Sequence, residues 1–78
     1  MRERPRETVV TAKSSVIARL SYDPDMQTLE VEFRSGRLYW YFGVPLSEFE
    51  QLKGADSMGA YFNREIRPRY EGREIRSG

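Results

Sequence analysis

The stretch that decides the fold is Leu29-Glu-Val-Glu-Phe-Arg-Ser-Gly-Arg-Leu-Tyr-Trp-Tyr-Phe42. Apolar and charged residues alternate up to Phe33, and a short polar break separates this run from a second one. Two such runs around a polar break are typical of a β-hairpin. The second run, residues 38–42, is apolar or aromatic throughout. It indicates a strand that is covered on both faces or that carries an aromatic surface.

The polar break determines which residues of the two strands face one another. A two-residue I′ turn would force Ser35 to a positive φ, where Asn or Gly is preferred. A three-residue loop with Gly36 in the left-handed region, as a G1 bulge, fits the sequence better. This register predicts three facing pairs: Val31 with Tyr39, Leu29 with Tyr41, and Glu30 with Trp40. The tyrosines then join the aliphatic face and the tryptophan lies outside, whereas a slip of one residue would reverse the faces.

A further strand is predicted before the hairpin, over residues 16–22. Its inward side chains are expected to be Val16, Ala18, Leu20 and Tyr22. The segment Asp23-Pro24-Asp25 that follows is typical of a turn. Its two carboxylates alone are too few for a cation site.

A first helix is predicted after the hairpin. It begins at Pro45 or, if Ser47 and Glu50 form a capping box, about two residues later. Gly54 is expected to end it as a left-handed residue. Its apolar side is predicted to consist of Leu46, Phe49, Leu52 and Lys53.

A second helix is predicted to follow, capped by Asp56 or Ser57. Pro68 should end it, because a residue before proline, here Arg67, is disfavoured in the helical region. The apolar side of this helix is predicted to consist of Met58, Tyr61, Phe62 and Ile66.

These elements predict an α+β fold, a three-stranded antiparallel β-meander followed by two short α-helices packed on one face. The domain is expected over residues 9–70, between a flexible N-terminal arm, 1–8, and a flexible C-terminal tail, 71–78. A chain of 78 residues supports a single thin core.

The composition narrows the function classes. The sequence has no cysteine and no histidine, so disulfides, thiolate metal sites and imidazole catalysis are excluded. Thirteen basic residues nearly cancel twelve acidic ones. Only two of the thirteen are lysine, which reflects either codon bias or planar recognition of phosphate or carboxylate by arginine. No apolar run reaches the ~20 residues of a membrane helix, and no secretory signal is evident, so a soluble cytoplasmic protein is expected.

Several motifs together resemble the KTSC domain, over about Val9 to Tyr70. They are Ser14-Ser15, Tyr22-Asp23, Leu29–Phe33, Gly36, Tyr39-Trp40-Tyr41, Val44-Pro45, Ala55-Asp56-Ser57, Gly59, Tyr61-Phe62-Asn63 and Ile66. The Tyr-x-Tyr is the most recognisable mark of the family, and its middle residue is often polar there. The resemblance implies a domain of unknown function, found free-standing in bacteria and at the C-terminus of some lysyl-tRNA synthetases, and therefore suspected of RNA binding.

The candidate RNA-binding residues are Trp40, Lys53, Arg64, Arg67 and Arg69. Trp40 is expected either to stack on bases or to contact a protein, since exposed aromatics serve both purposes. The three arginines form either a phosphate-contacting edge or a solvated face with ion pairs to neighbouring glutamates.

Other candidate sites have simpler explanations. Ser57 and Gly59 are a candidate anion site at the start of the second helix. The favoured explanation is plain capping together with close packing of Gly59 against the first helix. Tyr39 and Tyr41 are expected to be core residues rather than a stacking platform. A serine–lysine pair between Ser14 or Ser15 and Lys13 or Lys53 has no supporting motif.

The favoured function is therefore a non-catalytic accessory module that binds RNA or tRNA, without cofactor or metal. The alternative is a protein-interaction module or a homodimer, joined by a sheet edge or by the face that carries Trp40.

Overall fold

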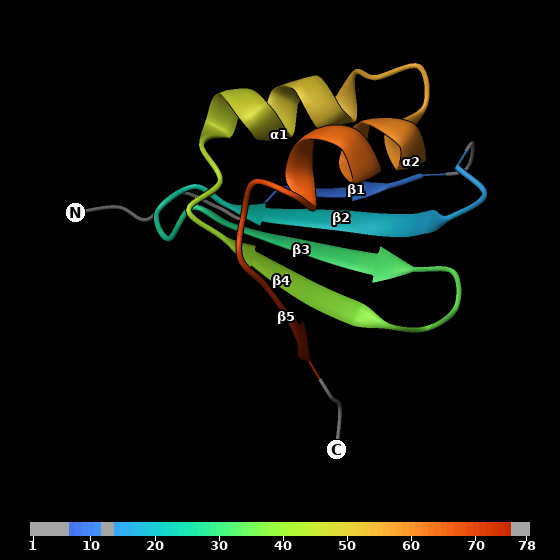
Figure 1. The fold of residues 1–78 in the computed structure, drawn as a ribbon, viewed down its shortest axis with the longest axis horizontal. Coiled ribbons are helices and arrows are strands. Elements are labelled where there is room, and N and C mark those ends of the chain that lie inside the picture. The colour runs from blue at the N-terminus through green and yellow to red at the C-terminus, as the bar shows by residue number, and fades with distance from the viewer. Residues whose placement is uncertain (1–6, 12–13, 76–78) are drawn as a thin grey trace.

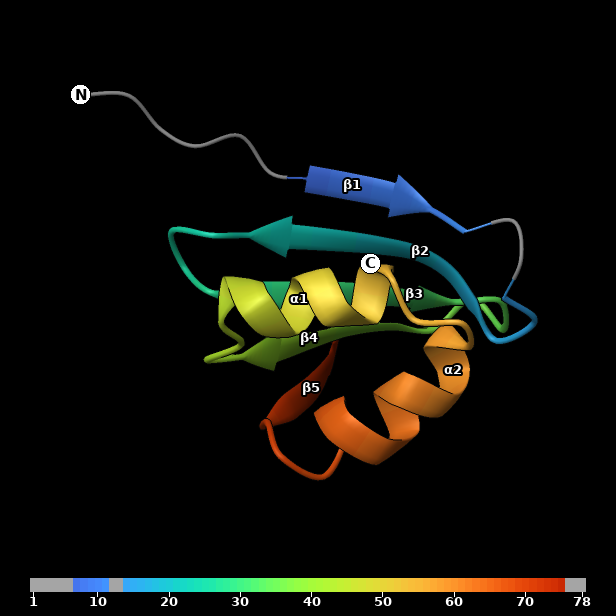
Figure 2. The same ribbon diagram turned by 90° about the horizontal axis from the view of Figure 1, so that it is seen from above.

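Five strands form one antiparallel sheet in the order β1-β2-β3-β4-β5, and two helical segments cover one of its faces (Figure 1). The computed structural model describes residues 7–11 and 14–75. The elements are β1 (Glu7–Val10), β2 (Ile17–Asp23), β3 (Thr28–Phe33), β4 (Leu38–Phe42), α1 (Leu46–Lys53), α2 (Met58–Tyr61), the π-helical turn η1 (Phe62–Ile66) and β5 (Gly72–Ile75). Viewed from above, α1 runs along the sheet while α2 and η1 lie beside it (Figure 2). Among the residues that the structure describes, no helix lies on the opposite face of the sheet (Figure 1).

The α+β class is confirmed, but the prediction of three strands is wrong. Strand β1 pairs with β2, and β5 pairs with β4, so both outer strands extend the predicted meander. β1 begins inside the segment expected to be an arm, and β5 lies inside the segment expected to be a tail. Both are four residues long and largely exposed. Short edge strands are held by the backbone ladder of a neighbour, so they leave little apolar alternation in the sequence.

The hairpin is confirmed in its register and its turn. Gly36 adopts φ 98°, in the left-handed region, and its amide donates to the Phe33 carbonyl over 2.9 Å. The Phe33 amide donates to the Arg37 carbonyl, also over 2.9 Å, which closes the loop. The facing pairs are Leu29 with Tyr41, Glu30 with Trp40, and Val31 with Tyr39. Both tyrosines consequently face the helices.

A register shift in β2 corrects the predicted facing of its first residues. The shift lies between Ile17 and Arg19 in the pairing with β3. It turns Ile17 into the core at 0% exposure, whereas Val16 is 46% exposed. Ala18, also expected to face inward, is only half-buried. A bulge adds one residue to a strand and so inverts the alternation on one side of it, which a simple period of two does not anticipate.

Helix α1 has three features that differ from the sequence prediction. Pro45 is its N-cap residue, and no side chain, including that of Ser47, caps its first turn. Gly54 ends the helix at φ −93°, so it is not left-handed. Leu46 is 44% exposed, while Phe49 and Leu52 are fully buried. The predicted apolar side is therefore buried from Phe49 onward, while Leu46 at the start of the helix faces solvent.

The second helix starts as predicted and ends differently. The Ser57 hydroxyl accepts a hydrogen bond from the Ala60 amide over 3.2 Å, which identifies Ser57 as the cap. The helix then widens into η1, where the Arg67 amide donates to the Phe62 carbonyl five residues earlier. Arg67 keeps helical dihedrals, φ −58° and ψ −43°, so the predicted departure from the helical region is wrong. Pro68 still ends the helix because it has no amide hydrogen to donate.

The core lies between the sheet and the helices. Tyr22 and Phe49 stack with ring centroids 4.7 Å apart, and the Tyr22 hydroxyl donates to the Val44 carbonyl. This bond satisfies the polar end of a side chain that is only 1% exposed. The buried apolar residues are Ile17, Leu20, Tyr22, Leu29, Val31, Tyr41, Val44, Phe49, Leu52, Phe62 and Ile66.

Gly36→Ala should destabilise the fold by about 1 kcal/mol, because alanine is strained at a φ of 98°. Gly54→Ala is the matched control: at φ −93° its new Cβ would meet only the Glu50 carbonyl, at 3.6 Å. The control should be neutral or stabilising by up to about 1 kcal/mol. Urea unfolding of both variants checks this, and equal stability in the two would contradict the bulged hairpin.

Candidate nucleic-acid interface

A groove of about 510 Å³ opens where the free end of the β3–β4 hairpin meets η1. We call it the hairpin groove. The residues that form its aromatic and cationic parts are Phe33, Arg37, Tyr39, Tyr41, Phe62 and Arg67. Three of these come from β3 and β4, two from η1 and its end, and Arg37 from the hairpin loop. The groove thus joins the family's Tyr-x-Tyr to the end of the second helix.

Four aromatic rings form the floor of the hairpin groove. Phe33 contacts Tyr39 and Phe62 edge-on, with ring centroids 5.7 Å and 5.5 Å apart. Tyr41 contacts Phe62 edge-on at 5.3 Å and stacks beside Tyr39 at 6.1 Å. Edge-to-face and offset contacts at these distances are favourable, so the floor is a preorganised aromatic surface. Tyr39 and Phe33 are only half-buried, which leaves part of the floor accessible.

Tyr41 brings a polar group into this apolar floor. The residue is 5% exposed, lines the hairpin groove, and makes no hydrogen bond with any described residue. Burial raises the pKa of its hydroxyl, and the nearby Arg67 guanidinium opposes that rise. The hydroxyl is therefore protonated at neutral pH and is available to donate a hydrogen bond into the groove.

Two arginines beside the floor have no acidic partner among residues 7–11 and 14–75. Arg67 donates only to the Asn63 side-chain oxygen, over 3.3 Å, and Arg37 makes no side-chain hydrogen bond or ion pair there. Arg34, which also lines the groove, is instead held by the carbonyls of Ser14 and Thr11. A guanidinium without a carboxylate partner can bind phosphate without first breaking an ion pair.

The other predicted basic residues are paired with acids. Arg64 contacts Glu65 over 3.0 Å, and its guanidinium lies 5.6 Å from the Tyr61 ring centre. Lys53 bonds to Glu7 over 2.5 Å and lies 3.4 Å from Glu50. Both are positioned by intramolecular contacts, so they are weaker candidates for phosphate binding than Arg67.

Arg69 belongs to a polar cluster around Glu48, which is 7% exposed on α1. Arg69 lies 3.5 Å from one Glu48 oxygen, and the Tyr70 hydroxyl donates to the same oxygen over 3.1 Å. The Tyr61 hydroxyl donates to the other oxygen. These contacts tie α1 to the second helix and to the turn after η1, so Arg69 has a structural role as well as a positive charge.

Trp40 does not converge with the basic residues. It lies on the helix-free face of the sheet, where its indole nitrogen donates to a Glu30 carboxylate oxygen over 2.9 Å. Phe42 contacts it edge-on at 6.5 Å. The structure therefore separates Trp40 from Arg67 by the thickness of the sheet, and they form two different surfaces.

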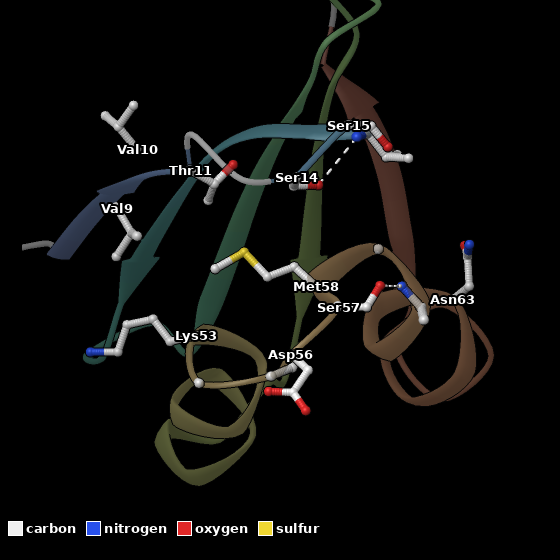
Figure 3. Close-up of a pocket in the computed structure, with 15 residues that line it drawn as sticks. Val9, Val10, Thr11, Ser14, Ser15, Lys53, Asp56, Ser57, Met58 and Asn63 are labelled. Carbon is white, nitrogen blue, oxygen red and sulfur yellow. Dashed lines mark hydrogen bonds between the residues drawn. The ribbon is translucent and has the colours of Figure 1, made fainter.

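The candidate anion site at Ser57 and Gly59 lines a second pocket, of about 770 Å³ (Figure 3). The Ser57 hydroxyl already accepts the Ala60 amide. A Cβ on Gly59 would lie 3.6 Å from the Val16 side chain, so this glycine packs against the segment before β2 and not against α1. The simpler explanation, capping and packing, accounts for both residues.

The proposed serine–lysine pairs do not form in the part of the chain that is described. The Ser14 hydroxyl accepts the amides of Val16 and Ile17, and Lys53 is bound to Glu7. Lys13 lies outside the described residues. Among the residues that are described, no group of three or more His, Cys, Asp or Glu could hold a metal ion. No described helix is long and apolar enough to cross a membrane.

The sequence prediction missed the hairpin groove and Arg37. A signal was present, because Arg37, Tyr39 and Tyr41 are spaced by two and therefore lie on one face of the strand. The second contributor, Arg67, lies far away in the sequence. Only the packing of η1 on the hairpin brings it there.

The sequence profile of the KTSC domain matches residues 13–70, most of this hairpin and helix arrangement. This chain belongs to the KTSC family. An uncharacterized protein from Stutzerimonas stutzeri is 46% identical over 61 residues, which cover 78% of this chain and 86% of that protein. The crystal structure of a KTSC domain protein from Yersinia pestis matches with a TM-score of 0.85 and 32% identity, over 92% of this chain and 100% of that one.

A lysine–tRNA ligase from Nostoc punctiforme contains a related segment. It is 41% identical over 63 residues, which cover 81% of this chain and only 11% of the ligase. The KTSC chain thus corresponds to a small part of that enzyme.

Alkaline pH should destabilise this KTSC protein through the Glu48 cluster. Burial and the hydrogen bond to Glu48 raise the pKa of Tyr61 from 10.0 to about 12. A raised pKa favours the protonated form in the folded state, so this stabilisation is complete below pH 10 and is lost as the pH rises toward 12. Urea unfolding at pH 8 and above pH 10 should show the loss.

Tyr61→Phe should reduce this alkaline loss because it removes the titrating hydroxyl. Tyr39→Phe is the control, since its hydroxyl makes no hydrogen bond with the described residues. If Tyr61→Phe lost stability with rising pH as steeply as the wild type, the contact between Tyr61 and Glu48 would not be the cause of the alkaline destabilisation.

Proposed function

We propose that this KTSC protein is a non-catalytic RNA-binding module, with tRNA as one class of ligand. The observation that carries the proposal is the aromatic floor of the hairpin groove beside Arg37 and Arg67, two cations without acidic partners in the described chain. Arginine charge and aromatic surface are the two features that single-stranded nucleic acid binding uses. The related segment in a lysine–tRNA ligase supports RNA as the ligand.

The described residues form no recognisable catalytic assembly, and this supports a binding role. The chain has no histidine or cysteine. In the described region its serines and lysines are not paired with one another, and Glu48, its buried carboxylate, is occupied by Tyr61, Tyr70 and Arg69. These three contacts give the buried acid a structural role, because they tie α1 to the second helix and to the turn after η1.

Removing both groove cations in Arg37→Ala/Arg67→Ala should weaken tRNA binding across sequences. The slope of log K against log salt should become shallower by about 0.7 for each phosphate that the variant no longer neutralises. Fold stability should change by less than about 0.5 kcal/mol for each exposed charge. A tRNA titration at several salt concentrations measures affinity and slope together.

The control variant is Arg19→Ala/Arg73→Ala, which removes the same charge from the helix-free face. Arg19 and Arg73 lie on the outer face of β2 and β5, beside Glu32 and Trp40. This variant should bind tRNA like the wild type. Equal reductions of affinity in both double variants would indicate a general effect of net charge and not phosphate binding in the hairpin groove. If the wild-type protein bound no tRNA even at low salt, the RNA function would be excluded.

A second copy of this chain is the alternative partner, and the helix-free face favours it. Leu38, Trp40 and Ile75 are half-buried there, and Phe42 is 37% exposed. Glu30 and Arg73 border this apolar patch with opposite charges. A patch that is bordered by both a negative and a positive charge can be complementary to a second copy of itself across a two-fold axis.

If this face forms a homodimer, Trp40→Ala should shift the protein to monomer and leave tRNA affinity unchanged. Light scattering over a concentration series measures the shift. A wild-type protein that is monomeric at every concentration would exclude the homodimer.

A further inference from the structure

We infer that the hairpin groove receives an unpaired RNA nucleotide, with its base on Tyr39 and its phosphate at Arg37 and Arg67. The inference rests on the proposed RNA function and specifies the ligand of that site. It assigns a stacking role to a tyrosine that the sequence places in the core.

The accessible part of the floor suits one base. Tyr39 is half-buried, with Phe33 edge-on to one side and Tyr41 stacked beside it. A volume of about 510 Å³ lies within the range of roughly 300–1,000 Å³ for small-ligand sites. Bases stack on aromatic side chains with little sequence preference, because every base has a π-face. A base inside a duplex is already stacked on its neighbours and cannot enter.

The polar groups of the groove match the rest of a nucleotide. Arg37 and Arg67 supply positive charge beside the floor, and Asn63, which holds Arg67, lines the same groove. The Tyr41 hydroxyl adds a donor. The residue is 5% exposed and lines the groove, and its hydroxyl makes no hydrogen bond with a described residue. The hydroxyl keeps contact with solvent, because every fully buried side-chain nitrogen or oxygen in the described residues has a hydrogen-bond partner. A hydroxyl that contacts solvent and has no partner within the described protein is free to donate a hydrogen bond to a ligand acceptor at this point.

The arrangement of charges also favours an anion at this end of the molecule. Glu74 faces Tyr39 across the β4–β5 pair but does not line the groove. Glu65 is engaged by Arg64 and Arg69, and none of the three lines the groove. The acids near the site are therefore either paired or outside the groove, and the phosphate position is cationic.

Fluorescence titration with a single-stranded ten-nucleotide RNA carrying one 2-aminopurine tests the inference in the full chain. The reporter should be quenched on binding, and a blunt RNA duplex of the same length should bind at least about tenfold more weakly. Tyr39→Leu should weaken single-strand binding about tenfold, since it removes the stacking surface. Tyr39→Phe keeps the ring and should retain the affinity, which separates loss of stacking from damage to the fold.

Two further readouts use other residues. Tyr41→Phe should weaken single-strand binding about two- to tenfold, since it removes one hydrogen bond. Trp40 is the only tryptophan and lies on the opposite face, so its emission should stay constant on binding, and Trp40→Leu should bind like the wild type.

The outcomes distinguish the two proposals. Equal affinity for duplex and single-stranded RNA would overturn the nucleotide assignment but not the proposed RNA binding. The same conclusion would follow if Tyr39→Leu bound single-stranded RNA with wild-type affinity. Quenching of Trp40 emission together with loss of binding in Trp40→Leu would move the site to the helix-free face and also overturn it. No binding of either RNA at low salt would remove the proposed function and this inference together.

Discussion

The left-handed conformation of Gly36 is the constraint on which the rest of the structure depends. It produces the three-residue loop, and the loop sets the register of β3 against β4. Side chains alternate along a strand, so this single register directs Tyr39 and Tyr41 toward the helices and Trp40 away from them. A slip of one residue would place the tryptophan under η1 and expose both tyrosines. The separation of the two candidate surfaces therefore originates in one turn.

Strand β5 reinforces this arrangement at the other edge of β4. Gly72 faces Tyr41, and a Cβ there would lie 2.3 Å from the nearest atom of the Tyr41 ring. No real side chain tolerates such a contact without displacement of the ring, so only glycine allows β5 to pair here while Tyr41 keeps its place. The close contact between Gly72 and the Tyr41 ring therefore allows β5 to pair with β4 and keeps Tyr41 in the floor of the hairpin groove.

Local patterns predicted the centre of the fold, and long-range packing decided the rest. The hairpin register, the Ser57 cap and the burial of Phe49 and Leu52 could all be predicted from residue patterns that span a few positions in the sequence. The bulge in β2 turns Ile17 into the core in place of Val16. It depends on the pairing of β2 with β3, so the alternation of side chains along the strand does not predict it. The groove combines Arg37 with Arg67, which neither composition nor spacing connects. The edge strands are held mainly by backbone hydrogen bonds to the neighbouring strands, and the pattern of side chains in the sequence does not predict these bonds.

Ion pairing, and not the number of basic residues, decides which arginines can serve a ligand. A net charge of +1 and a cluster of arginines after residue 63 identify a basic segment without ranking its members. Arg69 spans Glu48 and Glu65, and Arg64 pairs with Glu65, so a phosphate would have to compete with carboxylates for either. Arg67, three residues beyond Arg64, lines the hairpin groove, which Arg64 does not, and among the described side chains it donates only to the Asn63 amide oxygen. The widened π-helical turn rotates the residues that follow it relative to a regular helix, and such turns are frequent at functional sites. We therefore attribute the free position of Arg67 to η1 itself, because this turn separates the cation that faces the groove from those that hold the helices together.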